Sequence, residues 1–390
     1  METKPAGPPV SPYAALAGIT VALAMFGAAQ GLSYPLFTIL MQRQGLSPSM
    51  IGLSAAMMPL GLILSASLVP AAVRLFGARG LAVGCAILAA LCFLLVGWLQ
   101  NWVAWYLVRF VIGFVINPLY ILGEVWALAL APDARRGRIM GIFNAVMGAG
   151  YASGPLSLSL VGTEGWAPFA VGIGAFIACA AILSVVSRGL SGFDDDGEGA
   201  GRSVWWFARI APALLLAVVV SAATQQSTYS LLPVFGAAYG LAEAALPALI
   251  TMLSLGNIVL QVPLGLAAER AGGRAMIIAC SLATALCALS LPFVIQTPWV
   301  WPILVVMGGV GYGVYTMALV ELGTRFRGSA VVAGNSAFAL MWGVGGIIGP
   351  PGSGLAIQGF GAAGLPAVIA GLSFFLVFFA LWREWRRRHT

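Results

Sequence analysis

Long apolar runs, separated by short polar turns, follow one another along almost the whole chain. Each of the twelve runs has about the 20 residues that an α-helix needs to cross the hydrocarbon core of a bilayer. Their approximate cores are residues 13–41, 49–72, 78–99, 102–131, 138–162, 166–187, 208–236, 243–268, 275–295, 299–320, 330–357 and 363–382. The runs lack the strict alternation of a transmembrane β-barrel. The pattern therefore predicts an all-α membrane protein with twelve transmembrane helices.

One long polar segment, residues 188–209, interrupts the series between the sixth and seventh runs. It contains the acidic stretch DDDGE at residues 194–198, and its glycines and acids are typical of a solvated linker. A metal site in this stretch is the alternative interpretation, and we expect the linker. The predicted parts are a cytoplasmic tail (1–12), a six-helix half (13–187), a cytoplasmic linker (188–209), a second six-helix half (210–382) and a basic cytoplasmic tail (383–390).

Identical residues recur at a constant offset of 195 residues, which is half of the chain length of 390. The matched pairs include Gln30 and Gln225, Tyr34 and Tyr229, Gly77 and Gly272, Cys85 and Cys280, Gly113 and Gly308, Gly150 and Gly345, and Gly154-Pro155 and Gly349-Pro350. Two six-helix halves in the same orientation imply a pseudo-two-fold axis along the membrane normal. Such parallel repeats are typical of carriers whose substrate site lies near the bilayer midplane, between the halves.

Composition and charge agree with this topology. The chain is 61% hydrophobic and 8% charged, whereas soluble domains average about 25% charged residues. With the N-terminus placed in the cytoplasm, Arg43 and Arg109 are the exceptions among 19 Lys and Arg residues that otherwise fall on the cytoplasmic side. The positive-inside rule therefore places both termini in the cytoplasm and explains the net charge of +7 without a nucleic-acid partner.

Several kinds of chemistry are disfavoured by the residues present. The five cysteines lie in apolar runs without a C-x-x-C pair, and His389 is the one histidine, so we expect no metal site, disulfide framework or cofactor. Lys4 is the one lysine and no Walker motif is present, which excludes direct drive by ATP. The glycine pairs at 311–313 and 343–345 lie inside apolar runs, where close helix packing explains them better than dinucleotide binding. We expect no enzyme. The run that begins at Tyr13 is too long for a cleavable signal peptide.

The fourth run carries a polar stripe through an otherwise apolar helix. Gly113, Asn117, Tyr120 and Glu124 lie within about 80° of Arg109 around the helix axis. A charge near the bilayer centre costs roughly 2.5–3.5 kcal/mol, so such residues usually face a protein cavity and have a function there. The stripe therefore marks this helix as the candidate functional element.

Motifs along the chain resemble those of the major facilitator superfamily. Residues 265–274, GLAAERAGGR, resemble its loop signature G-x-x-x-D/E-R-x-G-x-R, whose matching positions are Gly265, Glu269, Arg270, Gly272 and Arg274. The copy of this loop in the first half, residues 70–79, has Arg74 where the acid would stand. Residues 109–113 look like the superfamily's fourth-helix arginine motif. Gly150, Gly154 and Pro155 look like the fifth-helix glycine-proline signature common among antiporters.

Two further stretches look closest to the YcaD-like group of bacterial carriers. They are residues 261–265, QVPLG, and residues 123–126, GEVW, in which Val125 replaces the usual serine of that group. The resemblance implies a multi-pass carrier of the bacterial inner membrane. Its motif positions are the expected gating residues: Glu269, Arg270, Gly265, Gly272, Arg274, Gly150, Gly154 and Pro155. Glu269 is expected to pair with Arg135, Arg136 or Arg138 across the halves, with an ordinary solvated loop charge as the alternative.

The resemblance also implies that helices 1, 4, 7 and 10 line a central cavity. Polar and aromatic residues gather on these four runs, and an unpaired amide in a membrane is costly unless it meets water, a ligand or another helix. The candidate substrate-binding residues are Gln30, Tyr34, Arg109, Asn117, Tyr120, Gln225, Gln226, Tyr229, Tyr312 and Tyr315. Asn144, Asn335 and Trp342 are expected at the edges of the cavity. Bonding between neighbouring helices is the alternative role of the amides.

Arg109 and Glu124 are the candidates for coupling. Arg109 has three open roles: ligand of an anionic substrate, fixed charge beside a proton carrier, or interhelical contact. Glu124 is expected to be the only acid well inside a span. A low-dielectric site would favour its protonated form and allow proton exchange near neutral pH, with a cytoplasmic gate contact as the alternative.

The leading functional prediction is proton-coupled export of a small organic molecule by a secondary active transporter. It depends mainly on the resemblance of residues 150–155 to the antiporter signature. Uptake of a small anionic or polar metabolite, based on Arg109, is the runner-up. A carrier-like receptor or assembly factor that no longer transports is the alternative from another class. The expected partners are the substrate, protons and the lipid bilayer, and the chain is expected to be a monomer.

Overall fold

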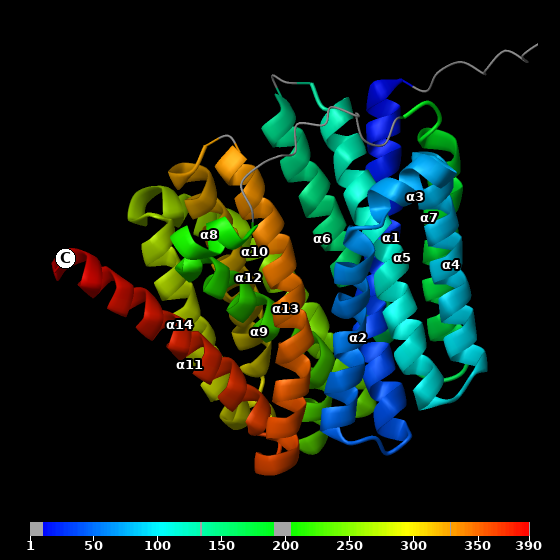
Figure 1. The fold of residues 1–390 in the computed structure, drawn as a ribbon. Helices are drawn as coiled ribbons and strands as arrows, with labels where there is room; N and C mark the ends of the chain where they lie inside the picture. Colours follow the sequence, from blue (N-terminus) through cyan, green and yellow to red (C-terminus); the bar gives the residue numbers. More distant parts are fainter. Residues whose placement is uncertain (1–10, 133–134, 191–203, 328, 390) are drawn as a thin grey trace, which may run out of the picture.

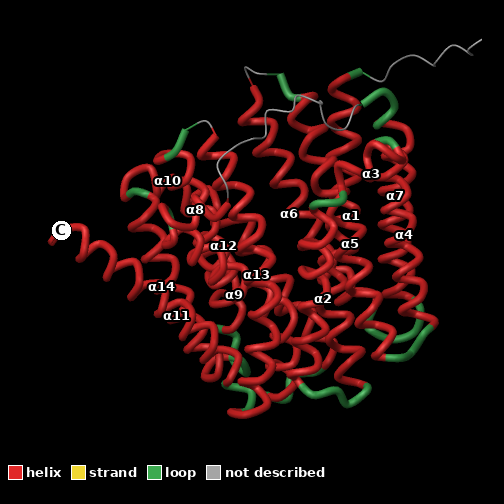
Figure 2. Tube along the Cα trace, in the orientation of Figure 1, coloured by secondary structure: helices red, strands yellow, loops and turns green. Residues whose placement is uncertain are grey.

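The described part of the chain consists of helices joined by short turns. A computed structural model describes residues 11–132, 135–190, 204–327 and 329–389 (Figure 1), and Figure 2 shows helix throughout this part apart from the connecting loops. The helices are α1 (Pro12–Arg43), α2 (Pro48–Ala66), α3 (Val69–Phe76), α4 (Ala78–Trp98), α5 (Trp102–Leu130), α6 (Arg136–Val161), α7 (Ala167–Val186), α8 (Val204–Ile210), α9 (Pro212–Ala238), the 3-10 turn η2 (Glu243–Ala245), α10 (Leu246–Ala271), α11 (Gly273–Val294), α12 (Val300–Arg325), α13 (Ser329–Phe360) and α14 (Gly364–His389). The acidic stretch of the predicted linker lies outside the described residues.

Ten helical segments in the described residues are long and apolar enough to cross a membrane. They fall on α1, α2, α4, α5, α7, α10, α11, α12, α13 and α14. The prediction of an all-helical chain rich in membrane-spanning helices is confirmed for this part of the protein. The two remaining predicted spans correspond to α6 and α9, which are 26 and 27 residues long.

Two of the predicted runs are divided between two α-helices. The run at 49–72 is divided between α2, which ends at Ala66, and the short α3, which has Pro70 in its first turn. The run at 208–236 begins inside α8, and α9 starts separately at Pro212. Proline fits the first turn of a helix, where its missing N–H is not needed, and cannot continue a preceding one. The two prolines explain the two breaks.

The repeat detected in the sequence has a direct counterpart in the packing. A Cβ atom added to Gly113 on α5 would lie 2.0 Å from the carbonyl oxygen of Met58 on α2. Its match, Gly308 on α12, would place a Cβ 1.9 Å from the carbonyl oxygen of Leu253 on α10. The same close approach of two backbones is therefore built twice. Between α3 and α4, and between α10 and α11, the matched Gly77 and Gly272 have φ of 69° and 84°, a region that favours glycine.

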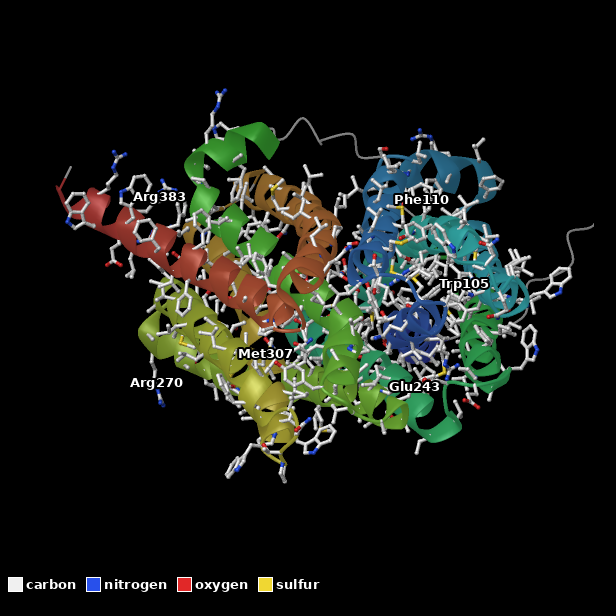
Figure 3. All side chains as sticks on the ribbon, turned by 90° about the horizontal axis from the view of Figure 1, so that it is seen from below. Trp105, Phe110, Glu243, Arg270, Met307 and Arg383 are labelled. Atoms are coloured by element: carbon white, nitrogen blue, oxygen red, sulfur yellow. The ribbon has the colours of Figure 1, made fainter. Side chains whose placement is uncertain are left out.

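The helices form two groups, an N-terminal group (α1–α7) and a C-terminal group (α8–α14), which lie side by side in Figure 3. They meet where α2 packs on α13, α6 on α10 and α1 on α9. We call the end of the bundle at which α1 ends and α2 begins the lower end, as drawn in Figure 1. There, a Cβ on Gly52 would lie 2.2 Å from the Pro350 carbonyl oxygen, and one on Gly354 would lie 2.4 Å from the Pro48 carbonyl oxygen. Backbone contact therefore joins the groups at the lower end.

Candidate functional site

Three tyrosines from both helix groups meet at the centre of the bundle. The ring of Tyr34 on α1 lies 5.9 Å from that of Tyr229 on α9 and 6.2 Å from that of Tyr151 on α6. The rings of Tyr151 and Tyr229 are 5.4 Å apart, and the Tyr229 hydroxyl is 3.1 Å from Ser254 Oγ. Tyr34 and Tyr229 are buried, with exposed fractions of 2% and 3%. This tyrosine cluster joins the groups, and the sequence had not pointed to Tyr151.

The predicted amides of the N-terminal group bond neighbouring helices. The Tyr120 hydroxyl donates to Gln30 Oε1 at 2.8 Å, and Gln30 Nε2 lies 3.6 Å from the Met58 sulfur. Asn117 Nδ2 donates to the Leu62 carbonyl oxygen on α2 at 3.2 Å. Both amides therefore have protein partners, which is the alternative role that the sequence left open for them.

Arg109 is enclosed within the N-terminal group. Its side chain is 0% exposed, its guanidinium carbon lies 4.9 Å from the centre of the Phe37 ring, and its Nη1 donates to Ser54 Oγ at 3.2 Å. Its Nε and Nη2 have no hydrogen-bond partner among the described residues. A buried charge with unpaired nitrogens is costly and usually has a functional reason. Tyr34 of the tyrosine cluster also lies within electrostatic range of this guanidinium.

Glu124 lies at the other end of the stripe and has different surroundings. Its side chain remains exposed in the bundle. It acts electrostatically on Tyr120 of its own helix and on Tyr312 and Tyr315 of α12. A carboxylate that faced lipid would not come within range of tyrosines in the second group. Glu124 therefore points toward the C-terminal group.

Opposite Glu124, three rings of the C-terminal group form an aromatic corner, defined as Tyr312, Tyr315 and Trp342. The Tyr315 and Trp342 ring centres are 4.8 Å apart with planes at 63°, and those of Tyr312 and Trp342 are 6.0 Å apart at 78°. Tyr312 and Tyr315 are 5.6 Å apart. Trp342 therefore packs edge to face on both tyrosines. The predicted Tyr312 and Tyr315 are thus brought together with Trp342.

A small pocket continues from this corner into the C-terminal group. Its lining includes Gln225, Thr224, Met307 (labelled in Figure 3) and Tyr312. Thr224 is 5% exposed, and its hydroxyl has no hydrogen-bond partner among the described residues. Gln226, the neighbour of Gln225, faces Tyr34 and interacts with its hydroxyl. A buried hydroxyl without a protein partner is the feature expected of a pocket that takes a polar ligand.

The predicted gating residues divide into packing and exposed positions. A Cβ on Gly150 or Gly154 would lie 2.3 Å from the carbonyl oxygen of Ala24 or Ala28, so the GxxxGP segment packs α6 tightly on α1 within one group. A Cβ added to Gly31 would lie 3.3 Å from Cδ of Pro155. In the loop after α10, Gly272 makes the turn described above and Gly265 is partly exposed without a close neighbour.

The charges of this loop lie at the upper end of the bundle. Glu269 and Arg270 are exposed, and Arg274 is half-buried (Arg270 is labelled in Figure 3). Arg135, one of the predicted partners of Glu269, is exposed. The side chains of Arg136 and Arg138 lie outside the described residues, so the predicted latch to them remains a prediction.

A second acid of a candidate span, to which the sequence had not pointed, lies near the end of α12. Glu321 lies in α12, within the span Val300–Arg325, and is 8% exposed. It forms an ion pair with Arg325 and borders a crevice that Arg274 and Arg383 also line. The run predicted from the sequence ended at residue 320, one residue before this acid. Among the described residues, no group of three His, Cys, Asp or Glu is placed to hold a metal ion.

A polar cluster at the lower end was also missed. Arg43 at the end of α1 donates to the carbonyl oxygen of Thr163 at 2.8 Å and to its hydroxyl at 2.6 Å. The same guanidinium forms an ion pair with Glu243 in η2 (labelled in Figure 3), and the Thr163 hydroxyl donates to this carboxylate. The cluster joins the two groups. As an exception to the positive-inside rule, Arg43 was the signal that could have revealed it.

Replacing Arg43 with glutamine is expected to loosen the lower end. In a protein without native cysteines, a cysteine replacing the buried Thr38, which donates to the Ser230 carbonyl oxygen at 2.7 Å, reports on opening there. Its labelling by a membrane-impermeant maleimide should be about two- to fivefold faster in the Arg43→Gln variant, because a half-exposed charge pair contributes about 1 kcal/mol or less. Arg79→Gln is the control, since Arg79 bonds the Ser184 carbonyl oxygen within one group. Equal labelling rates in the Arg43→Gln variant and the parent would contradict the expectation.

Comparison with known protein families identifies the family of this chain. The family model described as Major Facilitator Superfamily matches residues 19–322 and 214–390. The chain belongs to the major facilitator superfamily. It is therefore a multi-pass membrane transporter and not an enzyme, which confirms the resemblance seen in its loop and fourth-helix motifs.

Among relatives in this superfamily, the uncharacterized MFS-type transporter YfkF of Bacillus subtilis (strain 168) is 25% identical over 354 residues, 89% of this chain and 90% of the relative. The uncharacterized MFS-type transporter YcaD of Escherichia coli (strain SE11) is 25% identical over 75% of this chain and 74% of its own. The similarity to the YcaD-like group is thereby confirmed.

Solved structures of superfamily members share the fold. The nucleoside transporter NupG superposes with a TM-score of 0.74 at 13% identity, over 94% of this chain and 97% of that one. The D-xylose-proton symporter gives a TM-score of 0.73 at 15% identity, over 96% and 97% of the chains. At these identities the likeness establishes the fold, and the substrate has to be argued from the residues of this chain.

Proposed function

We propose that this chain exports a small organic molecule across the bacterial inner membrane, in exchange for protons, by alternating access between its two helix groups. Membership of the superfamily supports transport of a small molecule. The proposal includes twelve transmembrane helices, with α6 and α9 as the two further spans, both termini and the linker in the cytoplasm, and a monomeric chain with halves at 13–187 and 210–382. The lower end then faces the periplasm.

The observation that carries this proposal is the position of Glu124. It is an exposed carboxylate on α5 that faces the tyrosines of α12 in the second group. A group that takes up a proton at such a position changes the charge between the two halves, and this charge change is the coupling that an exchanger needs. The tyrosine cluster and the lower-end contacts support a conformation that is closed toward the periplasm.

Uptake of an anion is less well supported by the surroundings of Arg109. This guanidinium is fully buried and is in contact with Phe37 and Ser54. We propose instead that Arg109 acts as a fixed charge that holds α1, α2 and α5 together. Its unpaired nitrogens support a further contact in another conformation of the carrier.

The experiment is substrate-dependent pH change in proteoliposomes that contain the purified chain. The panel should include organic cations, nucleosides, sugars and carboxylates, each added to liposomes with a pH gradient in either direction. Proton movement that depends on one compound and on the protein supports an exchanger or symporter. Protons that move opposite to the compound indicate exchange and hence export, and protons that move with it indicate symport and hence uptake. A compound that binds the purified chain without moving a proton and without counterflow would favour the non-transporting receptor.

Alternating access predicts that fastening the lower end stops transport. Ser49 on α2 donates a hydrogen bond to Gln358 on α13, so cysteines at these two positions should be joined by a short bifunctional methanethiosulfonate reagent. The joined protein is expected to transport at the background of empty liposomes, and reduction should restore the rate. Cysteines at 79 and 184, within the N-terminal group, are the control and should leave transport intact. Undiminished transport in the joined 49–358 protein would rule out opening at this end.

A further inference from the structure

Of the charged residues on the helices around the aromatic corner, one is accessible to a ligand at the corner. Within the described parts of α1, α5, α9, α12 and α13, the charged residues are Arg43, Arg109, Glu124, Glu321 and Arg325. Arg43 belongs to the lower-end cluster, Glu321 and Arg325 pair with each other, and Arg109 is fully enclosed. Glu124 therefore supplies the charge that a ligand between the groups would meet on these helices.

The corner itself suits a positive charge. The faces of aromatic rings are negative, and a cation is attracted within about 6 Å of a ring centre, with indole the best ring and phenol next. The ring centres of Tyr312, Tyr315 and Trp342 are 4.8 to 6.0 Å apart, with Trp342 packed edge to face on both tyrosines. The three side chains are only partly buried, so the exposed part of this aromatic surface can contact a cationic group such as a quaternary ammonium. An anion would meet both the ring faces and the Glu124 carboxylate, and each would repel it.

The polar remainder of the site lies beside Tyr312. The hydroxyl of Thr224 is buried without a protein partner, and Gln225 lines the same small pocket. Both groups can donate and accept hydrogen bonds with a polar part of a ligand whose cationic part lies at the corner. The arrangement thus fits a molecule with a positive charge, an apolar or aromatic body and a polar end.

Resting on the proposed carrier function, we propose that the transported substrate is an organic cation bound between Glu124 and the aromatic corner. One carboxylate then serves proton and substrate in turn, because each neutralises it and excludes the other. Exchange of one monovalent cation for one proton follows, and it moves no net charge. The titratable groups within electrostatic range of Glu124 are Tyr120 on its own helix and Tyr312 and Tyr315 on α12.

Binding of tetraphenylphosphonium to the purified full chain tests this proposal, with tetraphenylborate as an anion of nearly the same shape and tetraethylammonium as a smaller cation. We expect saturable binding of a cation and none of tetraphenylborate. Glu124→Gln should weaken cation binding at least about tenfold, the loss that follows when one partner of a charge pair is removed. Trp342→Leu should weaken it about fivefold, and Trp342→Phe, which keeps a ring, less.

The control variant is Trp98→Leu, which removes a tryptophan that is 73% exposed at the end of α4 and should leave binding unchanged. Each variant must show the elution profile and melting temperature of the parent. Binding of neither cation, binding of tetraphenylborate, or equal cation affinity in the parent and the Glu124→Gln variant would each overturn the proposal. Glu124-dependent cation binding without proton-driven movement would leave the site standing and remove the carrier function. Proton-coupled transport of a neutral compound without cation binding would leave the carrier function standing and remove the cation site.

Discussion

Alanine at Gly113 or Gly308 is expected to destabilise the protein by about 1–3 kcal/mol at each site, the usual cost of overpacking a tight contact. The added Cβ would lie 2.0 Å from the Met58 carbonyl oxygen in one case and 1.9 Å from the Leu253 carbonyl oxygen in the other. Backbone atoms cannot turn aside as the end of a side chain can, so the two helices must separate. Thermal and denaturant unfolding of the purified variants measures the effect.

The same substitution at open helical glycines gives the matched control. Gly84 on α4 and Gly371 on α14 are exposed, and a Cβ added there meets nothing within 4 Å. Because alanine favours the helix over glycine by roughly 0.5–1 kcal/mol, these two variants should be as stable as the parent or slightly more so. The sign of the effect therefore separates close helix contact from a general response to alanine.

The two tight sites also test the repeat. They belong to different helix groups and share no neighbours, so their losses should be similar and nearly additive in the double variant. In the N-terminal group the substitution at Gly113 has a second cause of lost stability. Gly113 lies between Arg109 and Asn117, which bond Ser54 and Leu62 of α2, and separating the helices would break both bonds. Stability equal to the parent at both positions would show that the close approach is relaxed in the membrane.

The helices and their repeated packing could be predicted because each depends on local or periodic features. Apolar runs report helix length directly, and matched glycines report where two backbones approach. Gly113 and Gly308 were paired by their spacing alone, and the structure places them in equivalent contacts. The breaks at Pro70 and Pro212 were missed because a proline inside an apolar run is compatible with both a kink and a new start.

The surroundings of the charged residues could not be predicted. A helical projection places Arg109 and Glu124 on one side of α5, but it does not say which neighbour each meets along 29 residues of helix. Near one end the stripe faces α2 and Phe37, and near the other it faces α12. Tyr151 was missed for the same reason, since its role depends on Tyr34 and Tyr229 arriving from two other helices.

Glutamine at Glu124 is expected to reduce proton-coupled transport in proteoliposomes to the background of empty liposomes. Glutamine keeps the size and hydrogen-bonding capacity of the side chain but can neither take up a proton nor carry a negative charge. Aspartate, whose carboxylate is one methylene shorter, should retain part of the rate. Glu164→Gln is the control, because the side chain of Glu164 is 91% exposed at the lower end and its ion pair with Arg43 is long, at 3.9 Å, so it should contribute little.

Counterflow, the exchange of labelled for unlabelled substrate without a pH gradient, separates the two roles proposed for Glu124. If the carboxylate binds both proton and cation, Glu124→Gln loses counterflow together with proton coupling. If it carries only the proton, counterflow persists while the pH change disappears, and the cation must be bound elsewhere. Normal proton coupling in Glu124→Gln would eliminate both roles, and the buried Glu321 beside Arg325 would become the next candidate among the acids in the described spans.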